Sequence, residues 1–194
     1  MKKLVVILLI SLLAFMGCKK ESHRTLIAIH DFPVSVGSWW QYTVYNGYDS
    51  VYDTATVRIL DVTVVGNIPY QRWSETSVAF SSSDTIYEVA QDSAMLFCYT
   101  TDTNSQYVRI NFPIIENENW GPSYPGISYT TSIQSVTVNG MTFGTATYLN
   151  AHKPDQGGGI VDESMWIVKG IGIVRHKNFY QGIGDRRLLA YHIN

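Results

Sequence analysis

Apolar and polar residues alternate along most of the chain beyond its first forty residues. The alternation is clearest at 107–112, where Val108, Ile110 and Phe112 share one parity. Because successive side chains of a strand point to opposite faces, this period predicts a strand with one buried face. The same pattern predicts strands at 39–45, 55–65, 69–74, 85–91, 94–100, 129–138, 141–149, 171–177 and 188–193.

Turn signals separate these segments, and the strongest is Asn139-Gly140. Asn and Gly tolerate the positive φ that a two-residue hairpin turn needs, so we expect 135–138 to pair with 141–144. Within 129–138 the apolar parity changes, which predicts a β-bulge near Gln134. The segment 55–65 is apolar on both parities, which predicts a strand covered at least partly on both faces.

Helix is expected to be a minor component, because no stretch after the N-terminal segment keeps a helical apolar period for three turns. About ten short strands at spacings of roughly eight to fourteen residues favour an all-β fold over alternating strands and helices. We therefore predict one strongly curved antiparallel sheet that closes over its own concave side.

The first eighteen residues have the pattern of an export signal. Lys2 and Lys3 precede a thirteen-residue run from Leu4 to Met16 in which Ser11 is the only polar residue, and Gly17 and Cys18 follow. A bilayer-spanning helix needs roughly 20 apolar residues, so this run is too short to span. The end of the run resembles the lipobox of bacterial lipoproteins, in which cleavage precedes a cysteine that carries lipid. A plain secretory signal and an uncleaved anchor helix are the alternatives.

This resemblance implies a domain organisation. Residues 1–17 are the expected signal peptide, residues 18–30 the lipidated Cys18 and a polar tether, and residues 31–194 a single β-rich domain. Two or three acyl chains, at about 0.8 kcal/mol per buried methylene, would hold the chain on a membrane. Lys19 stands where the lipoproteins retained in the inner membrane have Asp, so the resemblance favours the outer membrane of the cell envelope.

Composition narrows the function further. The chain has 194 residues, 45% of them hydrophobic, with 14 Lys and Arg against 16 Asp and Glu. It has no basic surplus, which argues against a nucleic-acid partner. Its length and apolar content suit one globular domain. With Cys18 lipidated, Cys98 is the remaining thiol. We expect it to be a buried structural thiol, and a nucleophile is the alternative.

Aromatic residues are the candidates for ligand contact. The chain has 5 Trp and 13 Tyr, and such side chains can line a lipid groove or stack on sugars. Trp39, Trp40, Trp120 and Trp166 are the predicted contacts. The alternative is that they fill the core as cross-strand pairs. Trp39 and Trp40 are adjacent and must point to opposite faces of one strand.

The densest polar cluster runs from His152 to Glu163 and includes Asp155 and Asp162. These side chains could hold a hard cation. Their spacing matches neither a calcium loop nor a zinc motif, so a solvated hairpin loop is preferred, and no metal or cofactor is predicted. His176, between Arg175 and Lys177, is expected to face solvent near a sheet edge. No acyl-transfer motif provides a nucleophile, which makes a hydrolase the least favoured function.

Short aromatic motifs distributed over the domain resemble a known group of proteins. They are Phe32-Pro33-Val34 with 37–42, Asn111-Phe112-Pro113 with Trp120, and Trp166 with 170–174 and 189–191. In these motifs the chain is similar to the TapB-like envelope lipoproteins of bacteria. The resemblance implies the open half-barrel of the LolA and LolB carriers, and no activity is established for most members.

The sequence therefore predicts a non-enzymatic, lipid-anchored envelope protein that meets the membrane through acylated Cys18. Its concave sheet face is the expected site for an apolar or amphiphilic ligand. A glycan-binding or scaffold module of the envelope is the alternative.

Overall fold

The computed structural model describes residues 24–46, 50–65, 68–77, 83–91, 94–98, 106–116, 128–154, 160–178 and 183–194. These residues lie almost entirely in strands, which confirms the predicted all-β fold. The strands are β1 (Thr25–Ile27), β2 (Trp39–Asn46), β3 (Val51–Val65), β4 (Ile68–Ser77), β5 (Ser83–Gln91), β6 (Ala94–Cys98), β7 (Gln106–Asn111), β8 (Ile114–Ile115), β9 (Ser128–Val138), β10 (Met141–Pro154), β11 (Ile160–Val168), β12 (Gly172–Asn178) and β13 (Ile183–His192). A single 3₁₀ turn, η1 (Ile29–Asp31), is the helical element of this part of the chain. Within the same residues, no helix is long and apolar enough to cross a bilayer.

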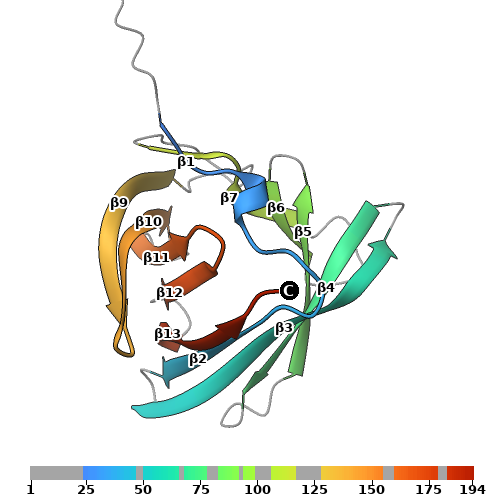
Figure 1. The fold of residues 1–194 in the computed structure, drawn as a ribbon, viewed down its shortest axis with the longest axis horizontal. Coiled ribbons are helices and arrows are strands. Elements are labelled where there is room, and N and C mark those ends of the chain that lie inside the picture. The colour runs from blue at the N-terminus through green and yellow to red at the C-terminus, as the bar shows by residue number, and fades with distance from the viewer. Residues whose placement is uncertain are drawn as a thin grey trace, which may run out of the picture.

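Eleven of these strands form one antiparallel sheet in the order β7-β6-β5-β4-β3-β2-β13-β12-β11-β10-β9. Figure 1 shows the sheet curving round on itself, as the sequence predicts. The ladder ends at β7 on one side and at β9 on the other, so the described strands do not close into a barrel.

A small second sheet lies at the gap between these two ends. β8 follows β7 along the chain and pairs with β1 near the N-terminus. From the other side, the Thr131 hydroxyl of β9 donates a hydrogen bond of 2.6 Å to the carbonyl of Ile115 in β8. Ile27 of β1 is 1% exposed, so the packed part of the molecule begins before residue 31.

All ten predicted strands are present, with boundaries shifted by a few residues, and three strands were missed. β1 and β8 are too short to show a period. β11 was missed because its alternation is broken by Glu163, a charged side chain on the same parity as buried Met165 and Ile167. The interval 152–163 is consequently not all loop, since His152 in β10 lies opposite Asp162 in β11.

The hairpin at Asn139-Gly140 is confirmed, with Val138 opposite Met141 and φ values of 46° and 83° at the turn. The bulge lies in β10, opposite the position in β9 where it was predicted. Phe143 and Ala146 of β10 pair with Val136 and Gln134 of β9, which leaves two residues of β10 opposite one of β9.

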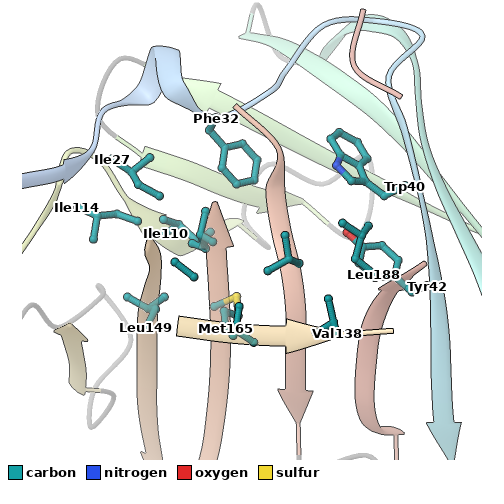
Figure 2. Packing of buried hydrophobic residues seen from close by; sticks show 14 of the residues in the cluster. Ile27, Phe32, Trp40, Tyr42, Ile110, Ile114, Val138, Leu149, Met165 and Leu188 are labelled. Carbon is teal, nitrogen blue, oxygen red and sulfur yellow. The ribbon is translucent and has the colours of Figure 1, made fainter. Parts of the chain in front are cut away.

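The core fills the inner face of the curved sheet (Figure 2). Trp40 stacks on Trp73 two strands away, with ring centroids 5.4 Å apart and planes 8° from parallel. The Trp40 ring nitrogen donates to the Ile171 carbonyl at 2.6 Å, and the Tyr42 hydroxyl donates to the Ile173 carbonyl at 2.9 Å. Both carbonyls precede the stretch of β12 that pairs with β13, so core side chains satisfy backbone groups at this end of the strand.

The segment 28–38 passes over the core and is held by the turn between β11 and β12. The Gly170 amide donates to the Asp31 carbonyl at 2.7 Å, and Lys169 Nζ lies 2.9 Å from Asp31 Oδ1. The hydrogen bond from Lys169 lowers the pKa of Asp31 below its usual value. Gly172 has φ +94°, and a β-carbon there would lie 3.3 Å from Pro33. The positive φ therefore favours glycine at this position, and a β-carbon there would also crowd Pro33.

The distal part of β3 is only partly covered. Leu60, Val62 and Val64 are 41%, 56% and 67% exposed, so the cover expected for these side chains is at best partial here. The register shifts between Ile59 and Asp61, and beyond this point the β3–β4 hairpin projects past the rest of the sheet (Figure 1). The sequence shows the apolar residues but does not show that β3 extends beyond the strands that would cover them.

Replacing Asn139 should separate two contributions to the hairpin. Its side-chain amide donates to the carbonyls of Leu188 and Arg187 at 2.9 and 3.2 Å. Asn139→Gly keeps the positive φ and loses these bonds, so we expect a loss of about 1 kcal/mol in the free energy of unfolding. Asn139→Ala should cost about 1 kcal/mol more, because alanine is strained at this φ. Urea unfolding of both variants checks this, and equal losses would contradict it.

Candidate functional site

Charged and polar side chains cross the inner face of the sheet beside the apolar core. They are Glu163 of β11, His176 of β12, Arg186 of β13, Asp53 of β3, and Glu75 and Ser77 of β4, and we call this set the inner polar row. Register places them on the core face. His176 lies opposite Met165 and Arg186, Arg186 lies opposite Val44, and Val44 lies opposite Asp53.

Three contacts connect the members of the inner polar row. His176 Nε2 and Glu163 Oε1 are 2.6 Å apart, and their side chains are 12% and 7% exposed. Arg186 Nη1 donates to Glu75 Oε2 at 2.8 Å. The Ser77 hydroxyl donates to the Asp53 carboxylate. Each charged member of the row therefore has a polar partner, as buried charges require.

The contact between Arg186 and Glu75 depends on the curvature of the sheet. β2 and β3 separate β13 from β4, and neighbouring strands are about 4.8 Å apart. On a flat sheet the two strands would be roughly 14 Å apart, which is a long reach for both side chains together. Curvature shortens the distances between side chains on the inner face and lengthens them on the outer face. Arg186 and Glu75 can therefore meet only on the inner face.

The inner polar row can bind polar groups by hydrogen bonding. It contains three carboxylates against one guanidinium and one imidazole, so it is acidic when the His is neutral. Arg186 and Glu75 keep 22% and 20% of their side-chain exposure, so solvent reaches part of the row. In the described part of the chain, no three His, Cys, Asp or Glu side chains gather closely enough to hold a metal ion.

The interpretation of His176 as a solvent-facing edge residue is wrong. β12 is paired on both sides, and the His176 side chain is 12% exposed and in contact with Glu163. The charged neighbours Arg175 and Lys177 suggested that His176 is exposed. They flank His176 in sequence, but their side chains point to the opposite face of the sheet. Glu163, expected in a solvated loop, lies in β11 and is buried.

The predicted tryptophan contacts do not form one surface. Trp40 is 2% exposed in the core. Trp39 and Trp166 lie on the outer face, and Trp120 is outside the described residues. Trp39 and Trp40 do point to opposite faces, as expected. As ligand contacts, the four tryptophans remain a prediction.

Both outer tryptophans contact side chains of their own chain. Trp39 stacks on His192 at 6.4 Å, with the Arg58 guanidinium 6.0 Å from its ring. Trp166 packs against Tyr148 at 4.9 Å, with the Arg175 guanidinium 5.1 Å from its ring. These contacts resemble the cross-strand pairs that stabilise sheets.

An ion-pair cluster continues this outer surface across β12 and β13. Asp185 accepts hydrogen bonds of 2.7 to 3.0 Å from Arg175 and from Arg187. Burial alone would raise the pKa of Asp185, but these two guanidinium groups outweigh burial and lower the pKa. The same contact raises the pKa of Arg187.

Two cysteines and one loop fall wholly or partly outside the described residues. Cys18 and residues 155–159 are among the residues not described, so the lipid anchor and the centre of the proposed cation loop stay predictions. Cys98 lies in β6, within the predicted strand 94–100, but its side chain is also outside the description.

Sequence reasoning missed Arg186 and Glu75 as site residues, although a signal for them exists. Arg186 has the parity of buried Leu188, and Glu75 has the parity of buried Trp73. A charged residue in phase with a buried apolar residue on a strand marks an inward-pointing charge.

Asp185→Asn should change how stability depends on pH. A lowered pKa in the folded state contributes stability that is present above the unfolded pKa of about 3.9 and is lost as pH falls below it. The variant should therefore be less stable than the wild type at pH 7, and the difference should shrink as the pH falls from about 5 to 3. Urea midpoints across this range test it, and parallel curves would contradict it.

Comparison with known proteins gives distant structural likenesses. No family model and no curated protein matches the sequence. A Bacteroides fragilis protein whose name describes it as exported and with a YMCC-like fold matches with a TM-score of 0.49 and 11% identity. The match covers 83% of this chain and 98% of that one. A protein from Parabacteroides distasonis that is named as a lipoprotein matches with a TM-score of 0.45 and 10% identity, over 87% and 100% of the two chains. At these values the matches establish neither a family nor a function for this chain.

Proposed function

We propose that this chain is a lipid-anchored protein of the bacterial envelope, and that its inner polar row binds the polar head of an amphiphilic ligand. One observation supports the binding role. Charged side chains from four strands meet on the face of the sheet that also holds the core. A buried charge destabilises the fold unless it is paired or binds a ligand.

The anchor rests on the N-terminal sequence. Two lysines, a short apolar run and Gly17-Cys18 form the pattern of a lipoprotein signal. Acyl chains on Cys18 would hold the β-rich body next to a membrane, and Lys19 favours the outer membrane. The resemblance to TapB-like lipoproteins supports the same location in the cell envelope.

The position of the ligand follows from what already fills the inner face. Trp40, Trp73 and their neighbours pack against each other, so the apolar part of this face is occupied by the chain itself. The inner polar row keeps partial exposure. Arg186 donates to Glu75 through Nη1, which leaves Nε and Nη2 for a polar head group. The ligand is therefore recognised by its head and not by its hydrocarbon.

The proposed role is binding and not catalysis. The hydroxyl of the row, on Ser77, donates to the Asp53 carboxylate and not to a histidine base. The proposal does not extend to glycan stacking on the outer face, since Trp39 and Trp166 contact Arg58 and Arg175 of the same chain.

Native mass spectrometry of the full chain, extracted from membranes in mild detergent, tests both parts. The protein should have the mass of a chain that begins at Cys18 and carries a diacylglycerol. A non-covalent passenger should accompany it. Arg186→Met should lower the bound fraction about tenfold or more, because a hydrogen bond to a charged group is worth about 1.5–3 kcal/mol.

Arg58→Met is the matched control, since Arg58 also lies on a strand but is exposed on the outer face. It should leave the passenger in place. A mass without lipid would contradict the anchor and leave the binding site standing. No passenger in any sample, or equal loss in both variants, would contradict the binding site and leave the anchor standing.

A further inference from the structure

Among the described strands, the distal part of β3 is paired along one edge only. β2 pairs with β3 from Val51 to Arg58, and Ser38 and Gly37 extend this contact through hydrogen bonds of 3.0 and 2.9 Å to Ile59. Beyond Ile59, β4 pairs with one side of β3 as far as Val65. No other described strand pairs with the opposite side of residues 60–65.

Apolar side chains recur at every second position of this edge. Leu60, Val62 and Val64 alternate with Asp61 and Thr63, and all three apolar residues are more than 40% exposed. Val36 of the neighbouring segment adds a fourth exposed apolar side chain, at 42%. A free edge with strand-forming apolar residues is a template for pairing with another strand.

We propose that this edge pairs antiparallel with the same edge of a second copy of the chain, with Val62 opposite Val62. The arrangement has a two-fold axis through that residue pair, so both copies use the same surface. It continues the sheet from one molecule into the next.

The sequence of the edge is complementary to itself in this register. Leu60 lies opposite Val64 of the second copy and Val62 lies opposite its equivalent, so apolar residues of one copy lie opposite apolar residues of the other. Asp61 lies opposite Thr63, which keeps the two Asp61 carboxylates from facing each other. Asp61 is already paired with Arg72 of β4. A shift of one residue would place apolar side chains opposite polar ones and expose half of them.

The self-complementary sequence of the edge favours a second copy over an unrelated strand as the partner. An unrelated partner would need no symmetry in the edge, whereas Leu-Asp-Val-Thr-Val has apolar residues placed symmetrically about Val62. The inference does not depend on the anchor or on the inner polar row, because neither contributes to this surface.

Cysteine cross-linking of the full chain in membranes tests the register. Directly opposite residues of an antiparallel pair have Cα atoms about 4.5–5.5 Å apart, within disulfide range. Val62→Cys should give a disulfide-linked dimer under mild oxidation. Thr63→Cys should give little, because Thr63 lies opposite Asp61, and the wild type controls for Cys98.

Charge substitution tests the energetics on the detergent-solubilised full chain by sedimentation over a concentration series. Val62→Lys places two ammonium groups opposite each other and removes apolar contact, so self-association should weaken about tenfold or more. Thr63→Lys adds the same charge to the other face, opposite Asp61, and should leave association unchanged or stronger.

Disulfide-linked dimers of the Val62→Cys variant, together with loss of association only in Val62→Lys, support the proposal. A wild-type chain that stays monomeric at about 100 µM, with no cross-linked dimer of Val62→Cys in membranes, overturns it. Cross-linking of Thr63→Cys as strong as that of Val62→Cys overturns the register. A cross-link from the Val62→Cys variant to a different protein overturns the second copy as occupant.

Discussion

The curvature of the sheet is the constraint on which the rest of this structure depends. It brings together inner side chains from strands that are not neighbours, as in the stack of Trp40 on Trp73 and the ion pair of Arg186 with Glu75. On a flat sheet these side chains would contact only adjacent strands. Curvature also leaves a gap between β7 and β9, at which β1 and β8 pack.

The inner face is divided into two regions with different roles. One is closely packed and apolar and provides most of the burial that stabilises the fold. The other contains Glu163, His176, Arg186 and Glu75, which form ion pairs at a cost in desolvation. Replacing such pairs with apolar side chains is often neutral or stabilising in proteins, so stability alone does not account for their presence on a core face.

Much of the fold was predictable from the sequence, because alternation and turn residues act locally. The strand pattern and the Asn139-Gly140 hairpin depend on neighbours along the chain, and they were placed correctly. The inner polar row was not predicted. Its members come from distant strands, and parity can mark a charge as pointing inward but does not say which distant charges will meet. His176 and Glu163 show this, since charged sequence neighbours made each look solvent-exposed although each is largely buried.

The most direct test of the account is a double-mutant cycle on Arg186 and Glu75, measured by urea unfolding of Arg186→Met, Glu75→Gln and the double variant. If the curved sheet brings these two side chains into contact across β2 and β3, the cycle should give a coupling free energy of about 1 kcal/mol, within the range of about 0.5–3 kcal/mol for residues in contact. Additive effects within about 0.3 kcal/mol, as for distant sites, would show that the inner face does not converge and would remove the proposed binding site.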